Sequence, residues 1–200
     1  MKQYFFALGL GPAFALGACG GSEPVTTVDN VVATDTIIPE NSIDANAATG
    51  TAINAATGAE VMTGQVFADT AGASDAYEVA AGKLAQQKAT SQALKDFGGM
   101  MVTGHTESTA KLKAAGARAT PAIAPNPKLT AEQEANLATL RDANGADFDT
   151  AYKAQQVVAH EKTLAAVQDY AANGTVPELK GFAATIAPVV QQHLDKIRGL

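Results

Sequence analysis

The stretch LKDFGGMMVTGHTESTAKLKAA, residues 94–115, decides the fold. Its inward-facing candidates recur at alternating spacings of three and four residues: Leu94, Phe97, Met101, His105, Ser108, Leu112 and Ala115. This spacing places them on one face of a long helix, because an α-helix turns every 3.6 residues. Gly98, Gly99 and Gly104 each weaken such a helix by about 1 kcal/mol relative to alanine. We therefore expect a neighbouring helix to approach this one closely.

Three further long helices are predicted, one before this stretch and two after it. The first spans about 67–89, the third about 147–172, and the fourth follows a capping box formed by Thr175 and Glu178. Their predicted inward residues are Tyr77, Ala80, Ala81, Leu84 and Ala85; Val157, His160, Leu164, Val167 and Ala171; and Leu179, Phe182, Ile186, Val189, His193 and Ile197. Pro188 falls inside the fourth helix and is expected to kink it.

The connection between the second and third long helices is rich in proline. Residues 116–128 include three prolines, and Thr130 with Gln133 forms a capping box that opens a short helix to about residue 143. Thirteen extended residues reach at most about 43–47 Å, enough to follow a helix of 27 residues along its length of about 40 Å. The prediction is an all-α, ferritin-like four-helix bundle with a long crossover and a short extra helix. Simple up-down-up-down topology is the alternative.

The N-terminus has the pattern of an export signal. Lys2 precedes an apolar run, 5–14, that is shorter than the roughly 20 residues of a membrane-spanning helix. The motif Leu16-Gly17-Ala18-Cys19 then resembles the bacterial lipobox, in which the cysteine is acylated. We expect residues 1–18 to be a signal peptide and the exported protein to be anchored to a membrane through lipid on Cys19. An ordinary signal peptide with an incidental cysteine is the alternative; Gly20, in place of aspartate, favours the periplasmic side of the outer membrane.

Residues 19–64 are predicted to be a flexible linker ahead of a helical domain at 65–200. They show neither helical nor alternating apolar spacing, and the sequence Asn-Ala-Ala-Thr-Gly occurs at 46–50 and again at 54–58. Such a segment buries too little apolar surface to offset the entropy lost on ordering. A strand that packs on the domain is the alternative.

Two groups of residues resemble the bacterial domain-of-unknown-function 4142 family. The first contains Tyr77-Glu78, Gly82 and residues 97–105; the second contains Phe148-Asp149, Tyr152, Gln155, His160, Phe182-Ala183, Pro188 and His193-Leu194. The resemblance covers roughly residues 64–198. It implies a ferritin-like bundle, commonly exported or membrane-anchored, with no established activity. The family usually has aspartate immediately before the histidine of the second helix, where this chain has Gly104.

The chain has three histidines, and each lies on the inward face of a different predicted helix: His105, His160 and His193. Glu78 lies on a face of small residues in the first helix. An unpaired buried polar group costs about 1–3 kcal/mol, so buried polar groups gather where they have partners. We therefore expect these four residues to converge in one layer.

Two interpretations of this layer remain open. Imidazole nitrogens and a carboxylate suit a divalent metal such as zinc, manganese or iron. The same residues also suit a hydrogen-bonded core network, or a polar layer that binds a small ligand. Ring nitrogens within about 5 Å of one another would favour the metal. A dinuclear centre is not indicated, because valine replaces the glutamate of the Glu-x-x-His motif at positions 102, 157 and 190.

Composition excludes several other classes of function. The formal net charge is −6 and no block of Lys or Arg exists, so nucleic acid is not an expected partner, and no protein partner is indicated. No nucleophile elbow, phosphate loop or cysteine pair is present, and an enzyme is the less favoured class. The predicted function is that of a cell-envelope lipoprotein whose bundle binds a ligand or partner through the Glu/His layer. The alternative is a mononuclear metal-binding protein.

Overall fold

The structure is a computed structural model that describes residues 50–53 and 60–200. The predicted signal peptide, Cys19 and most of the predicted linker lie outside these residues. Two short strands, β1 (Thr51–Ile53) and β2 (Glu60–Met62), pair antiparallel just before the first helix. The prediction of a linker without secondary structure up to residue 64 is therefore wrong at its C-terminal end. Backbone hydrogen bonds between the two strands order this segment, although its side-chain pattern does not predict strands.

Five helices follow: α1 (Gly64–Lys88), α2 (Gln92–Arg118), α3 (Ala131–Asp142), α4 (Gly145–Asn173) and α5 (Pro177–Arg198). The all-α prediction is confirmed, with four long helices and one short one. None of the helices in the described part of the chain is long and apolar enough to cross a membrane.

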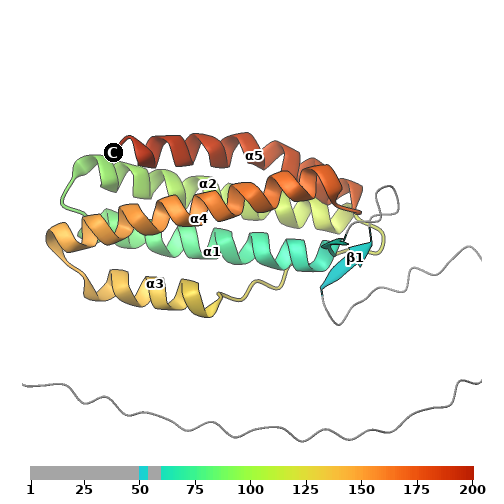
Figure 1. Ribbon diagram of the computed structural model, residues 1–200, viewed down its shortest axis with the longest axis horizontal. Helices are drawn as coiled ribbons and strands as arrows, with labels where there is room; N and C mark the ends of the chain where they lie inside the picture. The colour runs from blue at the N-terminus through green and yellow to red at the C-terminus, as the bar shows by residue number, and fades with distance from the viewer. Residues whose placement is uncertain (1–49, 54–59) are drawn as a thin grey trace, which may run out of the picture. The chain divides into compact units, whose positions relative to one another are not determined.

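The four long helices form a bundle in which α1 packs on α2, α4 on α5, α2 on α5 and α1 on α4 (Figure 1). After α2, the proline-rich connection and then α3 run back along the outside of the bundle, so that α4 starts at the end where α2 starts. As a result α2 and α4 run in the same direction. This is the ferritin-type arrangement, and simple up-down-up-down topology is wrong. The connection does not cross the bundle alone, because α3 covers the rest of the length.

Close packing of α1 on α2 depends on two facing glycines. A Cβ at Gly98 would lie 2.6 Å from the carbonyl oxygen of Gly82 and 2.9 Å from Cβ of Ala85. A Cβ at Gly82 would likewise lie 2.6 Å from the carbonyl oxygen of Gly98. Two helices with side chains at these positions could not approach so closely, because real Cβ atoms do not come within 3.0 Å of backbone oxygen. The predicted close approach is confirmed.

Helix starts agree only partly with the predicted caps. The Thr130 and Gln133 capping box is present, with both reciprocal hydrogen bonds. The predicted box of Thr175 and Glu178 is wrong, because Val176 is the N-cap residue of α5 and Pro177 occupies the first turn. Proline needs no N–H partner there and its fixed φ suits a helix start, so it takes over the role of a side-chain cap.

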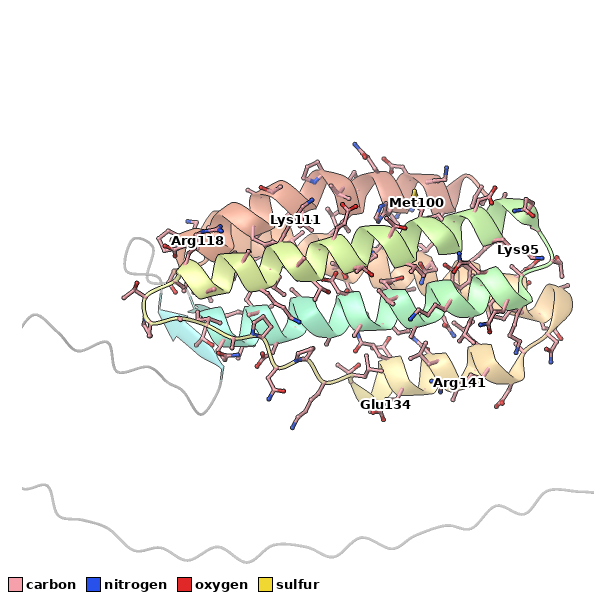
Figure 2. All side chains as sticks on the ribbon, turned by 180° about the vertical axis from the view of Figure 1, so that it is seen from behind. Lys95, Met100, Lys111, Arg118, Glu134 and Arg141 are labelled. Carbon is pink, nitrogen blue, oxygen red and sulfur yellow. The ribbon has the colours of Figure 1, made fainter. Side chains whose placement is uncertain are left out.

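The inward faces carry two apolar core clusters, one around Phe97 and Phe148 and the other around Phe67 and Tyr170. Fully buried aromatic residues anchor both ends, including Phe97 and Phe148 toward one end and Phe67 and Tyr170, stacked 3.8 Å apart, toward the other. In α5 the structure buries Val190, whereas Val189, which we predicted to face inward, is only half-buried. Figure 2 shows charged side chains on the outer surfaces of α2 and α3, among them the exposed Lys111, Arg118, Glu134 and Arg141.

Candidate metal centre

Three histidines from three helices meet inside the bundle. His105 comes from α2, His160 from α4 and His193 from α5, and they are 4%, 1% and 7% exposed. One ring nitrogen of each lies within 4.8 Å of one ring nitrogen of the other two. The ring centroids are 5.6 to 5.8 Å apart. The predicted convergence of the histidines is confirmed, and they do not lie at different heights along the bundle.

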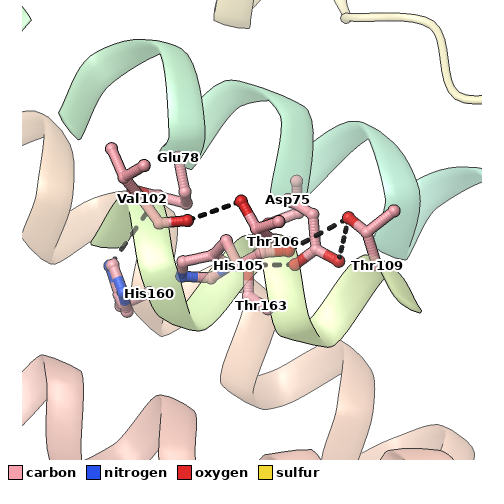
Figure 3. Close-up of polar contacts among 9 residues, drawn as sticks. Asp75, Glu78, Val102, His105, Thr106, Thr109, His160 and Thr163 are labelled. Atoms are coloured by element: carbon pink, nitrogen blue, oxygen red, sulfur yellow. Dashed lines mark hydrogen bonds and ion pairs between the residues drawn. The ribbon is translucent and has the colours of Figure 1, made fainter. Parts of the chain in front are cut away.

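Asp75 in α1 holds His105. Its Oδ1 lies 2.8 Å from Nδ1 of His105, and its Oδ2 accepts a hydrogen bond of 3.1 Å from the hydroxyl of Thr109 (Figure 3). Because the carboxylate accepts from Nδ1–H, the lone pair of His105 is on Nε2. This Nε2 atom is buried and has no hydrogen-bond partner.

His160 is held in the same way by a backbone carbonyl. Its Nδ1 donates to the carbonyl oxygen of Gln156, one turn earlier in α4, at 2.8 Å. Its Nε2 is also buried and without a hydrogen-bond partner. In His193 the corresponding buried, unpartnered atom is Nδ1. Each of the three rings therefore keeps one buried nitrogen that no hydrogen bond satisfies.

Glu78 lies beside the three histidines rather than among them. It is 1% exposed, and its Oε1 lies 3.8 Å from Nδ1 of His160 (Figure 3). Neither carboxylate oxygen has a hydrogen-bond partner. Four residues were predicted to share a layer. The three histidines lie close enough to bind one ion together, and Glu78 lies next to His160.

Several polar residues near the histidines, in space or in sequence, make no hydrogen bond to them. The Tyr77 hydroxyl donates to Oε1 of Gln155 at 3.1 Å, so it is engaged away from the histidines. The buried Tyr152 hydroxyl has no partner. Glu107 and Glu161 lie close in sequence to two of the histidines but are exposed, because successive helical residues point about 100° apart.

Burial and mutual charge set the proton affinities of the cluster. Burial, together with the smaller effect of a charge on His105, lowers the pKa of His160 to about 3 and that of His193 to about 4. Burial also lowers the pKa of His105, but the hydrogen bond to Asp75 and the charge of Glu78 outweigh it, so the net shift is upward. Burial raises the pKa of Glu78 to about 7, against the opposing effect of His105. At neutral pH two imidazoles are therefore neutral and offer free lone pairs.

This set of donors fits a divalent cation. The neutral imidazoles of His160 and His193 supply two nitrogen ligands, His105 supplies the third once its Nε2 has lost its proton, and the carboxylates of Asp75 and Glu78 together can balance a charge of +2. Tetrahedral coordination with metal–nitrogen bonds of 2.0–2.1 Å needs nitrogens roughly 3.3–3.4 Å apart. The present limit of 4.8 Å thus requires the rings to close by at most about 1.4 Å, which rotation about side-chain bonds can supply.

Comparison with known proteins gives a family and no activity. Residues 48–200 match the domain described as "Domain of unknown function (DUF4142)". Neither the curated proteins nor the solved structures contain a match to the chain. The match covers both strands, all five helices and every residue of the three-histidine cluster. By this match over more than half of its length, the chain belongs to the DUF4142 family.

Proposed function

We propose that the bundle binds one divalent metal ion through His105 Nε2, His160 Nε2 and His193 Nδ1. The observation that carries this proposal is that each of these three atoms is buried and without a hydrogen-bond partner, in a cluster where one ring nitrogen of each histidine lies within 4.8 Å of one ring nitrogen of the other two. An unsatisfied buried polar atom costs about 1–3 kcal/mol, so three at one point are expensive unless a ligand compensates them. A metal ion satisfies all three at once.

Support also comes from the second ring nitrogen, Nδ1, of His105 and of His160. Metal-bound histidines characteristically donate their other N–H to a carboxylate or a backbone carbonyl, which fixes the ring and its tautomer. Asp75 accepts from His105, and the carbonyl of Gln156 accepts from His160. A network that served only to fix the helix register would use its polar atoms on one another. Here one buried nitrogen of each histidine is unpaired.

The chemistry of the donors favours zinc, with iron and manganese as the other candidates. Imidazole nitrogen is a good ligand for zinc, whereas manganese prefers more oxygen ligands than this site offers. In a tetrahedral site, three histidines leave a fourth position for water.

Elemental analysis tests the proposal. Purified protein is treated with chelator, incubated with Zn²⁺, Mn²⁺ or Fe²⁺, passed through gel filtration and analysed by mass spectrometry for metal. We expect about one ion per chain for the preferred metal. A content below about 0.1 ion per chain with all three metals rejects a metal site. The Glu/His layer would then be a structural or small-ligand layer.

We further propose that the bundle works at the cell envelope as a lipoprotein anchored through Cys19. The lipobox-like residues 16–19 after a short apolar run are its support. In cell fractionation, the wild-type chain is expected in the membrane fraction and the Cys19→Ser variant in the soluble fraction. Membrane retention of the variant would reject lipidation, and it would leave the metal proposal unaffected.

A further inference from the structure

We infer that small solutes reach the three-histidine cluster from the face between α2 and α5, through an opening that exists because residue 104 is glycine. This inference deepens the proposed function, since it concerns how an ion reaches that site. It also makes a claim about solvent access to His193 that holds with or without a metal. Its basis is the contact between Gly104 and the His193 ring.

His193 is the histidine closest to solvent. It is 7% exposed, against 1% for His160. The Nδ1 atoms of His105 and His160 are hydrogen-bonded inside the bundle, and their Nε2 atoms are fully buried, as is Nδ1 of His193. Nε2 of His193 is neither hydrogen-bonded nor fully buried. It is therefore the ring nitrogen through which the cluster meets water.

Gly104 lies directly against this ring. A Cβ at position 104 would stand 3.3 Å from Cε1 of His193 and 3.6 Å from its Nε2. The first distance is shorter than nine in ten real Cβ contacts, so even alanine would press on the ring. A larger side chain would also cover Nε2. Glycine in a helix interior costs about 1 kcal/mol relative to alanine, and here it leaves the ring uncovered.

Buried side chains cover the α1 side of the cluster. Asp75 and Glu78, on the α1 side, are 4% and 1% exposed. Between α1 and α4, the hydroxyls of Ser74 and Thr163 lie 2.8 Å apart and bridge the two helices one turn away from Glu78 and His160. The hollow between α1, α3 and α4 that Ser74 and Thr163 line includes none of the three histidines in its lining, so a path along that face would have to pass beyond it. The path past Gly104 needs only movement of the His193 ring.

Two variants with a matched control test the inference. Gly104→Ala and Gly104→Leu add side chains of increasing size against His193. Gly181→Ala and Gly181→Leu make the same changes in α5 where a Cβ would have nothing within 4 Å. Each pair shares the gain in helix propensity, so a difference between the pairs reports the contact with His193.

The first measurement needs no metal. Diethyl pyrocarbonate acylates neutral imidazole nitrogen, and peptide mapping by mass spectrometry follows each histidine separately. In metal-free wild-type protein we expect His193 to react first, and we expect Gly104→Leu to slow that reaction at least about tenfold, a difference of roughly 1.4 kcal/mol in the barrier. Equal reactivity of the three histidines, or equal rates in the Gly104→Leu and Gly181→Leu variants, overturns the inference.

The second measurement uses Co²⁺ as the probe and stopped-flow absorbance as the readout. We expect association and release to slow in the order wild type, Gly104→Ala, Gly104→Leu, with no such order in the Gly181 variants. Loss of binding in Gly104→Leu, together with slower exchange in Gly104→Ala, also supports the inference. Unchanged exchange in both Gly104 variants overturns it. Absence of Co²⁺ binding in the wild type would instead reject the metal site and leave the acylation result to decide access.

Discussion

Nδ1 of His105 in α2 lies 2.8 Å from Oδ1 of Asp75 in α1, and both side chains are buried. This pair joins the two most closely packed helices and fixes which nitrogen of His105 faces the other histidines. It also raises the pKa of His105, although burial opposes that shift. The pair is a positioning contact for the proposed metal site.

The Asp75→Asn variant should bind metal about 10–100-fold more weakly, the usual cost of losing a carboxylate behind a metal-bound histidine. Asparagine keeps the shape of the side chain but removes the charge that makes His105 a strong donor. Competition with a chromogenic zinc chelator measures the affinity. Asp195→Asn, at an exposed position in α5, is the control and should bind as the wild type does. Equal affinity of the two variants would remove Asp75 from the site.

Replacement of His160 by leucine separates a metal site from a structural network. His160→Leu removes one buried nitrogen without a partner, Nε2, and one hydrogen bond, from Nδ1 to the carbonyl oxygen of Gln156. The loss and the gain oppose each other, so the metal-free protein should change in unfolding free energy by no more than about 1 kcal/mol. Metal binding should be lost. Urea unfolding in chelator and elemental analysis measure the two quantities, with Glu107→Gln as an exposed control that keeps the metal. A loss of several kcal/mol in metal-free protein would favour the structural network.

The stability of the metal-free protein should rise with pH between about 4.5 and 6.5. His160 and His193 have pKa values lowered by burial to about 3 and about 4, so the unfolded chain protonates them in this range and the folded chain does not. Their stabilisation is present above the unfolded pKa of about 6.5 and is lost as the pH falls. Glu78, with its pKa raised by burial to about 7, acts in the opposite direction.

Between about pH 4.5 and 6.5 the unfolded chain binds two more protons, on His160 and His193, and the folded chain binds one more, on Glu78. The free energy of unfolding therefore rises by about 1.4 kcal/mol per pH unit. Above about pH 6.5 the free energy of unfolding falls as the pH rises. Glu78 and His105 have raised pKa values, so in this range the folded chain holds their protons and the unfolded chain loses them. Urea unfolding in chelator between about pH 5 and pH 8 should therefore show a maximum near neutrality. Stability that falls steadily from pH 5 upward would contradict these assignments.

Gly98→Ala should destabilise the bundle by about 1–3 kcal/mol, because its Cβ would overlap the backbone of Gly82. The gain in helix propensity, at most about 1 kcal/mol, is too small to compensate. Gly181→Ala meets nothing within 4 Å and should be neutral or slightly stabilising. Thermal unfolding of the two variants measures the difference. If Gly98→Ala is as stable as Gly181→Ala, the close approach of α1 and α2 is wrong.

The histidine cluster was predictable because each histidine sits on a regular stripe of apolar residues. The spacing of His105 from Met101 and Leu112, for example, already places it on the buried face of α2. The family resemblance added the ferritin-type topology, which short connections and a long crossover also favoured. Helix spacing was thus enough to place each histidine on a buried face, and the cost of an unpaired buried polar group indicated that they would meet.

Asp75 could not be identified in this way. It lies three residues before Glu78, among alanines and glycines that do not distinguish an inner from an outer face of α1. Only the position of α2 shows that Asp75 faces His105. The strand pair was missed for a related reason, since three residues on each side are too few to show an alternating pattern. At the start of α5, the capping pattern of Thr175 and Glu178 competed with Pro177, and proline prevailed.

X-ray absorption spectroscopy of the zinc-loaded protein tests the three-histidine site most directly. The account predicts a first shell of nitrogen and oxygen at about 2.0–2.1 Å with the outer-shell scattering of about three imidazoles per zinc. A variant in which two of the three histidines are replaced by glutamine should show the outer-shell scattering of about one imidazole per bound zinc. A shell with one imidazole or none, in protein that retains one zinc per chain, would contradict the account.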